Sequence, residues 1–169
     1  RVPDGGFVAQ SPTIPPMVEL PALLDASRSV AEDDAGNAQI KELLDAGSGS
    51  LGGARPKASV RDEQRLLLAK FSHPKDEWDV LAWEKTMLDM ACEVGIAVPK
   101  AKLVAIGDER ALLLERFDRE GSLLAGRRIG YMSAMTALGA TDGEPRDYGE
   151  LAEELPLLTK DIKPQLTEL

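Results

Sequence analysis

One short segment, residues 65–71, limits the possible folds of this chain more than any other. It reads Arg-Leu-Leu-Leu-Ala-Lys-Phe, and a short apolar run of this length predicts a β-strand. Lys70 ends the run, where a positive charge in apolar surroundings needs a partner or a ligand. A lysine that extends from the strand end into water is the alternative. The fold therefore has to bury this strand and still give its lysine either water or an anionic partner.

A helix predicted over residues 79–94 offers such a partner, and Gly95 follows at the position where helices commonly end. At about 100° per residue, Glu84 falls on the apolar side of this helix. That side carries Val80, Met87, Leu88 and Ala91. A buried carboxylate is costly unless a cation accompanies it. We therefore expect an ion pair between Lys70 and Glu84, the alternative being a helix rotated to expose Glu84 to water.

Further elements are predicted on both sides of this strand and helix. Strand-like segments cover residues 58–60, 102–106 and 110–117, and helical patterns cover residues 21–31 and 37–46. Residues 1–16 are expected to be an extended lead-in. From residue 129 onward the sequence looks helical, with breaks at Gly139, Asp142, Gly143, Pro156 and Pro164. Pro164 is expected to be the first residue of a last helix.

A loop rich in glycine and serine precedes the strands, and residues 50–57 read Ser-Leu-Gly-Gly-Ala-Arg-Pro-Lys. Gly52 and Gly53 would let backbone amides approach phosphate oxygens, while Arg55 and Lys57 add positive charge. The spacing matches neither the P-loop nor the usual kinase glycine triad, and a linker would look similar. Because glycines flank it, we expect Ser50 to lie in a mobile, exposed loop.

The overall composition narrows the possible functions. The chain has 20 Lys and Arg against 29 Asp and Glu, a formal net charge of −9, which disfavours direct binding of nucleic acid. No apolar run approaches the roughly 20 residues that cross a bilayer, and no signal-peptide pattern opens the chain, so we expect a cytoplasmic protein. Cys92 and His73, the single cysteine and histidine, are too few for a zinc site, so no metal ligand is assigned.

Taken in order, these segments resemble the HipA-type serine/threonine protein kinases, the toxins of bacterial toxin–antitoxin pairs. Residues 50–57 are similar to the family's serine-led glycine loop, Lys70 to its ATP-phosphate lysine, and Glu84 to its helix glutamate. Residues 115–119, Glu-Arg-Phe-Asp-Arg, resemble its hinge, although a strand that ends in a solvated turn would look the same. The resemblance implies an α+β fold, a small antiparallel sheet with packed helices like a kinase N-lobe.

The same resemblance implies ATP as the cofactor and an antitoxin-like DNA-binding protein as a possible partner. Lys70 and Glu84 would position the phosphates, and Ser50 would be the candidate for autophosphorylation. The backbone around Glu115 and Phe117 would hold adenine. The implied ATP-binding residues are Gly52, Gly53, Ala54, Arg55, Lys57, Lys70, Glu115 and Phe117. The implied division is a family-specific region at 1–47, a kinase-like N-lobe at 48–128 and the helical start of a second lobe at 129–169.

One segment imitates a catalytic loop. Asp142 lies in Gly-Ala-Thr-Asp-Gly-Glu, but the asparagine expected five residues later is Asp147, so we interpret this segment as a polar turn between two helices. We expect the catalytic base and magnesium ligands of such a kinase to lie beyond Leu169. The 169 residues are then expected to bind nucleotide weakly and to transfer no phosphate. A non-catalytic interaction module and an unrelated domain with accidental motifs are the alternatives.

Overall fold

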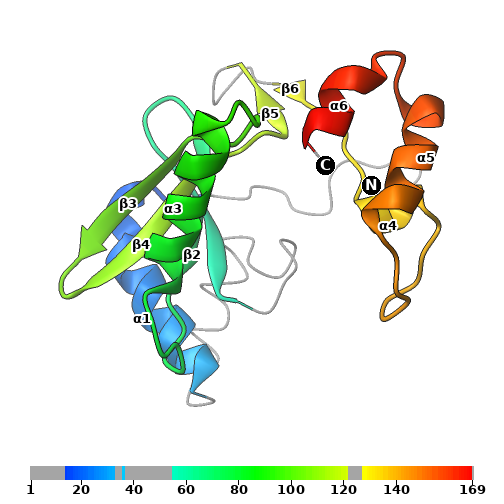
Figure 1. The fold of residues 1–169 in the computed structure, drawn as a ribbon. Helices are drawn as coiled ribbons and strands as arrows, with labels where there is room; N and C mark the ends of the chain where they lie inside the picture. Colours follow the sequence, from blue (N-terminus) through cyan, green and yellow to red (C-terminus); the bar gives the residue numbers. More distant parts are fainter. Residues whose placement is uncertain (1–13, 33–35, 37–54, 122–126, 169) are drawn as a thin grey trace, which may run out of the picture.

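A four-stranded antiparallel sheet with the strand order β1-β2-β4-β3 forms the centre of the protein (Figure 1). The computed structural model describes residues 14–32, 36, 55–121 and 127–168. The sheet strands are β1 (Lys57–Arg61), β2 (Leu66–Phe71), β3 (Ala101–Ile106) and β4 (Glu109–Glu115). Helices α1 (Leu20–Ala31) and α3 (Val80–Glu93) cover opposite faces of this sheet. The predicted α+β class with a small antiparallel sheet is therefore confirmed.

Strand β2 serves both faces of the sheet because its side chains alternate. Leu67, Ala69 and Phe71 are buried in the cluster that contains α1. Leu68 packs on the other side against the cluster that contains α3, and Lys70 shares that side by the two-residue period. The predicted strand at residues 65–71 is confirmed, starting one residue later than expected.

The α1 face holds the larger of the two apolar clusters. Leu23 and Leu24 pack against strand residues such as Val60 and Phe71. A short 3-10 helix, η1 (Met17–Glu19), leads into α1, which begins one residue before the predicted start. The preceding residues run beside the end of β1, where the Arg61 backbone N–H donates to the Pro15 carbonyl at 3.0 Å. This contact attaches the amino-terminal side of the described chain to the sheet.

Helix α3 is fixed at both ends by local signals that the sequence carries. The Asp79 side chain accepts a hydrogen bond from the Ala82 N–H at 2.9 Å and caps the first turn. Gly95, with φ of 88°, closes the other end, so the predicted helix at residues 79–94 is confirmed within one residue. Asp79 also bonds Arg110 of β4 at 2.7 Å, which ties the helix start to the sheet.

The apolar side assigned to this helix from its sequence is only partly right. Leu81 is buried and Leu88 packs beside it, but Met87, which we expected on the same side, is exposed. The reason is that apolar residues occupy most of the helix circumference, so periodicity alone does not identify the side that meets the sheet. Glu84, half-buried, lies between the packed side and the exposed one.

Beyond the sheet the described residues form a two-stranded ribbon and three helices. The ribbon pairs β5 (Arg119–Glu120) with β6 (Arg127–Arg128), and the sequence did not predict it. Helices α4 (Ala134–Ala137), α5 (Tyr148–Leu158) and α6 (Ile162–Glu168) lie together, apart from the sheet (Figure 1). The helical character expected from residue 129 is thus confirmed from Ala134 onward.

Two of the predicted helix boundaries are wrong. Pro156 lies inside α5 rather than at a break, close enough to the helix end that only two residues follow it. Pro164 is the third residue of α6 rather than its first, a position where the first turn needs no backbone N–H donor. The predicted helix at residues 37–46 and most of the predicted lead-in lie outside the described residues.

No helix in the described ranges combines the length and the apolar character that a bilayer crossing requires.

Candidate functional site

The predicted ion pair between strand and helix is present. Lys70 Nζ lies 2.5 Å from Glu84 Oε1, and the two side chains are 25% and 30% exposed. Lys70 belongs to β2 and Glu84 to the second turn of α3, so the contact joins the sheet to the helix on one face. Both charges are partly withdrawn from water, and each is compensated by the other. The alternatives of a solvated lysine and a rotated helix are therefore wrong.

Packing below this pair determines where Glu84 lies. Leu81 and Leu88, one turn to either side of it, pack in a cluster with Leu112 and Leu114 of β4. Leu112 is also the direct neighbour of Lys70 across the β2–β4 pair. The helix is thereby anchored over the strand next to the lysine, which brings the carboxylate within hydrogen-bond distance.

A second lysine lies beside the first. Lys57 of β1 is the cross-strand partner of Lys70, so both side chains project from the same face of the sheet. Burial lowers the pKa of Lys57, and the neighbouring charge of Lys70 lowers it further, while Glu84 acts in the opposite direction. Two ammonium groups and one carboxylate therefore share this part of the sheet.

Arg55 adds a third cation, which is held by Asp76. Its guanidinium lies 2.6 Å from the Asp76 carboxylate, which also accepts the His73 backbone N–H at 2.9 Å. The hydrogen bond from Arg55 is the main reason why the pKa of Asp76 is lowered. The charge of Glu84 also acts on Arg55, so these two residues belong to the same electrostatic environment. Arg55, Lys57, Lys70 and Glu84, all predicted as site residues, are thus brought together.

Glu115 and Phe117 lie at the other end of the sheet. Glu115 pairs with Leu67, three residues along β2 from Lys70, which corresponds to about 10 Å. Its carboxylate bonds Arg65 at 3.2 Å, and its backbone N–H donates to the Lys100 carbonyl at 2.9 Å. Strand β4 ends at Glu115, two residues earlier than predicted. Phe117 therefore lies outside the sheet, and its side chain is exposed.

A buried carboxylate organises the turn that follows. Asp118 accepts two hydrogen bonds from Arg116, at 2.7 and 2.8 Å, and one from Arg119 at 2.8 Å. The bonds from Arg116 are the main cause of its lowered pKa. No separate role was predicted for these residues beyond the hinge resemblance. The alternation of arginine and aspartate was the signal that could have predicted the cluster.

Several predicted residues lie outside the described part of the chain. They are Ser50, Gly52, Gly53 and Ala54 of the glycine-rich loop. The proposed phosphate contacts of the loop backbone and the autophosphorylation of Ser50 therefore stay predictions.

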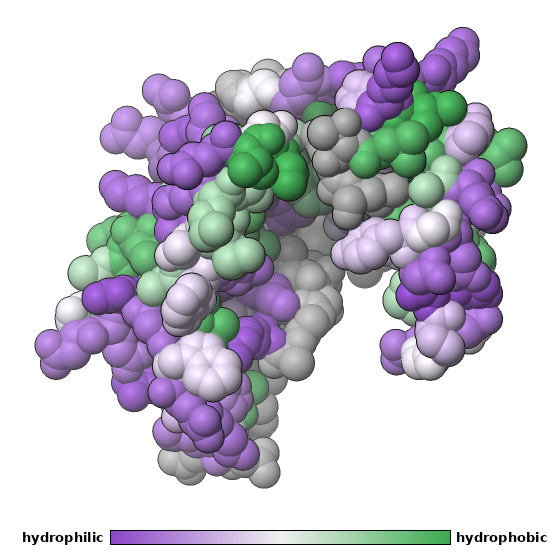
Figure 2. Space-filling view, viewed as in Figure 1, coloured by the Kyte–Doolittle hydropathy of each residue, from purple (hydrophilic) through white to green (hydrophobic). Residues whose placement is uncertain are grey.

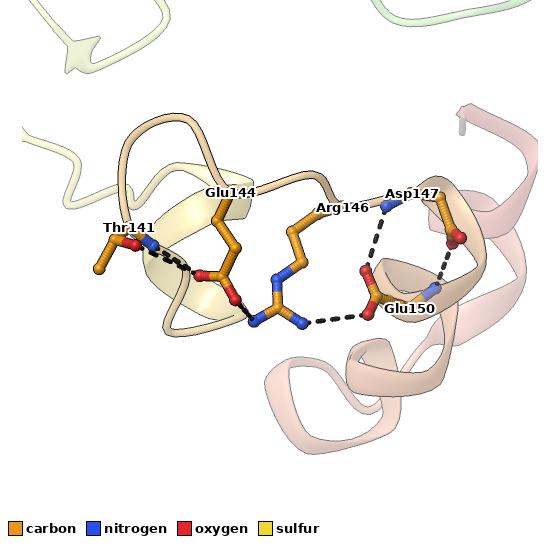
Figure 3. Close-up of polar contacts among 5 residues, drawn as sticks. All are labelled: Thr141, Glu144, Arg146, Asp147 and Glu150. Atoms are coloured by element: carbon orange, nitrogen blue, oxygen red, sulfur yellow. Dashed lines mark hydrogen bonds and ion pairs between the residues drawn. The ribbon is translucent and has the colours of Figure 1, made fainter.

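Asp142, which imitates a catalytic aspartate, lies in a turn between α4 and α5, as predicted. Figure 3 shows the polar contacts that build this turn and the start of α5. Asp147 and Glu150 form a reciprocal capping box, and Arg146 bridges Glu144 and Glu150 at 2.6 and 3.1 Å. Glu144 in turn accepts the Thr141 N–H at 3.0 Å. These contacts give Thr141, Glu144 and Arg146 a structural role in the turn.

A cavity lies apart from this site, and the described ranges contain no candidate metal centre. A cavity of about 660 Å³ lies between α1 and the β3–β4 turn, on the sheet face opposite Lys70. Across the described residues, no group of three or more His, Cys, Asp or Glu side chains is arranged to hold a metal ion.

The comparison with protein families gives a match that covers most of the chain. Residues 49–169 match the HipA-like C-terminal domain. The chain belongs to this family. The match begins within the glycine-rich loop and includes Lys70, Glu84 and the segment from Glu115 to Phe117. Neither the curated proteins nor the solved structures contain a match to the chain.

The ion pair predicts a measurable coupling between its two residues. Lys70→Met and Glu84→Gln should each destabilise the protein, because each leaves the opposite charge partly buried without its partner. The free energy of unfolding of the double variant should fall by about 1 kcal/mol less than the sum of the decreases in the two single variants. Urea unfolding of the four proteins measures this term. Strictly additive losses would mean that the two charges do not stabilise each other.

Proposed function

We propose that this HipA-like chain supplies the nucleotide-binding part of an ATP-dependent serine/threonine protein kinase. The observation that carries the proposal is the Lys70–Glu84 ion pair, with Lys57 as the immediate neighbour of Lys70. A strand lysine paired with a helix glutamate is the arrangement that positions ATP phosphates in protein kinases. The proposal concerns binding and positioning, and it assigns no catalytic base or magnesium ligand to these 169 residues.

The cations of the site fit the phosphates of a nucleotide. Lys57 and Lys70 present two ammonium groups from one face of the sheet, where a multiply charged anion would relieve their mutual repulsion. Glu84 would keep the Lys70 ammonium directed toward one position rather than leave it free to rotate. ATP, when bound, would supply the phosphoryl group, and the protein residues would bind and orient it.

The far end of β4 offers complementary groups for adenine. An adenine ring needs both a hydrogen-bond acceptor and a donor along its edge. The backbone carbonyl of Glu115 and the backbone N–H of Phe117 could provide them, whereas the Glu115 N–H is already used by Lys100. The roughly 10 Å between this end and Lys70 would separate base from phosphates. In this proposal residues 48–128 form the nucleotide-binding lobe, and residues 129–169 begin a helical second lobe.

Nucleotide binding tests the proposal directly. ATP titrated into the protein, followed by calorimetry, should give weak binding that Lys70→Met reduces about tenfold or more, because an ammonium–phosphate contact is lost. Lys102→Met is the matched control, since Lys102 is an exposed lysine on the edge strand β3. Equal affinities of both variants for ATP would contradict the proposed site.

One specific observation favours a second function, that of an interaction module. Helix α3 displays a row of large apolar side chains on the side that does not meet the sheet, visible as a pale to green stripe along this helix in Figure 2. Trp83, Met87, Met90 and Val94 are 61%, 58%, 54% and 74% exposed. Their spacing of four, three and four residues is the spacing by which one helix packs against another. We name these four residues the α3 stripe.

The charged residues that flank the α3 stripe determine which kind of partner helix would bind to it. Within α3 the acidic residues Glu84, Asp89 and Glu93 outnumber the single cation Lys85. Glu84 is paired with Lys70 and Asp89 with Lys85, so Glu93 is the one of the three without an ion pair to a described residue. A second copy of the chain would oppose these carboxylates with its own. A partner helix with an apolar seam and flanking Lys or Arg residues would complement them. An antitoxin-like DNA-binding protein is a candidate of this chemistry, because DNA binding itself requires positive charge.

A designed peptide tests the α3 stripe. The probe is a helical peptide with a leucine seam and flanking lysines, and Trp78→Phe leaves Trp83 as the only tryptophan. Binding should shift the Trp83 emission to shorter wavelength, and the added pair Met87→Gln and Met90→Gln should abolish the shift. Leu157→Gln, at an exposed leucine of α5, is the matched control. A peptide with flanking glutamates that binds equally well would refute the charge argument.

A further inference from the structure

The β5–β6 ribbon carries a group of arginines that the nucleotide site does not use. We propose that Arg119 and Arg128 form a binding site for a phosphate monoester. The ribbon follows the turn at Asp118 and is separate from the Lys70–Glu84 pair on the sheet. The proposal does not depend on ATP binding.

The two arginines oppose each other directly. Arg119 of β5 and Arg128 of β6 are cross-strand partners, so their side chains leave the ribbon on the same face. Like charges in this position destabilise a strand pair, and a ribbon with two residues in each strand has little stability of its own. An anion bound between the two guanidinium groups would attract both of them and so offset their mutual repulsion.

The neighbouring acids do not neutralise the pair. Arg116 and Arg119 share the single carboxylate of Asp118. Glu120 is occupied by Arg127, its own cross-strand partner. Arg128 forms no ion pair with any residue in the part of the chain that the structure describes. The connecting residues 122–126 read Ser-Leu-Leu-Ala-Gly and include no acid. Among the described residues, Asp118 is therefore the one carboxylate paired with this group of three arginines, and it is shared by Arg116 and Arg119.

The electrostatics of Arg119 agree with an anion site. Burial lowers the pKa of its guanidinium, and the charges of Arg116 and Arg128 lower it further, against the opposite effect of Asp118. This environment works against the positive charge that Arg119 carries at neutral pH. A bound anion would act in the other direction and stabilise the charged form.

The chemistry of the groups favours a phosphate monoester over a carboxylate. Each guanidinium presents several N–H donors in a fixed plane, and a phosphate offers three acceptor oxygens and close to two negative charges. The negative charge of the phosphate matches the net positive charge of the site, because the three arginines Arg116, Arg119 and Arg128 exceed the single carboxylate of Asp118 by two. A polyanion such as nucleic acid is disfavoured by the net charge of −9 on the whole chain.

Two aromatic rings border the arginines and give the site an apolar wall. Phe117 and Tyr131 meet edge to face with ring centroids 5.0 Å apart, and both side chains are exposed. The Tyr131 phenol is near enough to Arg116 and Arg119 to act on their charges. A phosphate attached to an organic group could therefore contact the rings as well as the arginines, which inorganic phosphate alone cannot do.

The test uses phosphate titrations at constant ionic strength. Inorganic phosphate, O-phosphoserine and sodium chloride are added separately to the whole chain, and the side-chain N–H signals of the arginines are followed by NMR. The Lys70→Met background removes the proposed nucleotide site, so failure of one site does not hide the other. Phosphate should shift the Arg119 and Arg128 signals and chloride should not. If O-phosphoserine binds more tightly than inorganic phosphate and Tyr131→Ala removes the difference, the ligand is an organic monoester. Equal affinities for the two compounds would identify free phosphate as the ligand.

Adjacent arginines provide the matched variants. Arg128→Gln should weaken phosphate binding about tenfold, because one of two charge-assisted contacts is lost. Arg127→Gln should leave it unchanged, because Arg127 is paired with Glu120. In phosphate-free buffer Arg128→Gln should not lower the thermal midpoint, since it removes a repulsion. Equal phosphate affinities of these two variants, or equal responses to phosphate and chloride, would overturn the proposal.

Discussion

The contact between Lys70 and Glu84 depends on how α3 is held over the sheet, and the rest of the candidate site depends on that contact. Leu81 and Leu88 dock the helix on β4, while the bond between Asp79 and Arg110 secures its first turn. A small rotation of α3 would move the carboxylate away from the lysine and leave two partly buried charges unpaired, which is costly. The apolar packing and the ion pair therefore stabilise the same helix orientation.

Strand register determines where the other residues of the candidate site lie. The pairing of β1 with β2 sets Lys57 beside Lys70, and the pairing of β2 with β4 sets Glu115 three residues away. Lys57 and Lys70 thus lie together at one end of the face, and the chain leaves the sheet at the other. In the proposed function these two ends serve phosphates and adenine, and a shift of the register by one residue would turn the lysines to the opposite face.

The sequence predicted the parts of the site that rest on strong local patterns. An apolar strand that ends in Lys70 and an amphipathic position for Glu84 were enough to anticipate their contact. The adjacency of Lys57 and Lys70 was not predictable because register is decided by the whole sheet. The β5–β6 ribbon was missed because its short strands consist of Arg and Glu and carry no apolar alternation. Met87 was assigned to the wrong side because α3 is apolar around most of its circumference.

Covalent labelling shows whether the Lys70–Glu84 pair marks a phosphate-binding site. An ATP derivative with an acyl group on its terminal phosphate transfers that group to a lysine amine held beside the phosphates. Mass spectrometry then identifies the modified lysines in the presence and absence of excess ATP, with the exposed Lys102 as an internal reference. We predict that Lys70 is labelled, that excess ATP protects it, and that Lys102 shows no such protection. Labelling of Lys70 and Lys102 to the same extent, unchanged by ATP, would contradict phosphate binding beside Lys70.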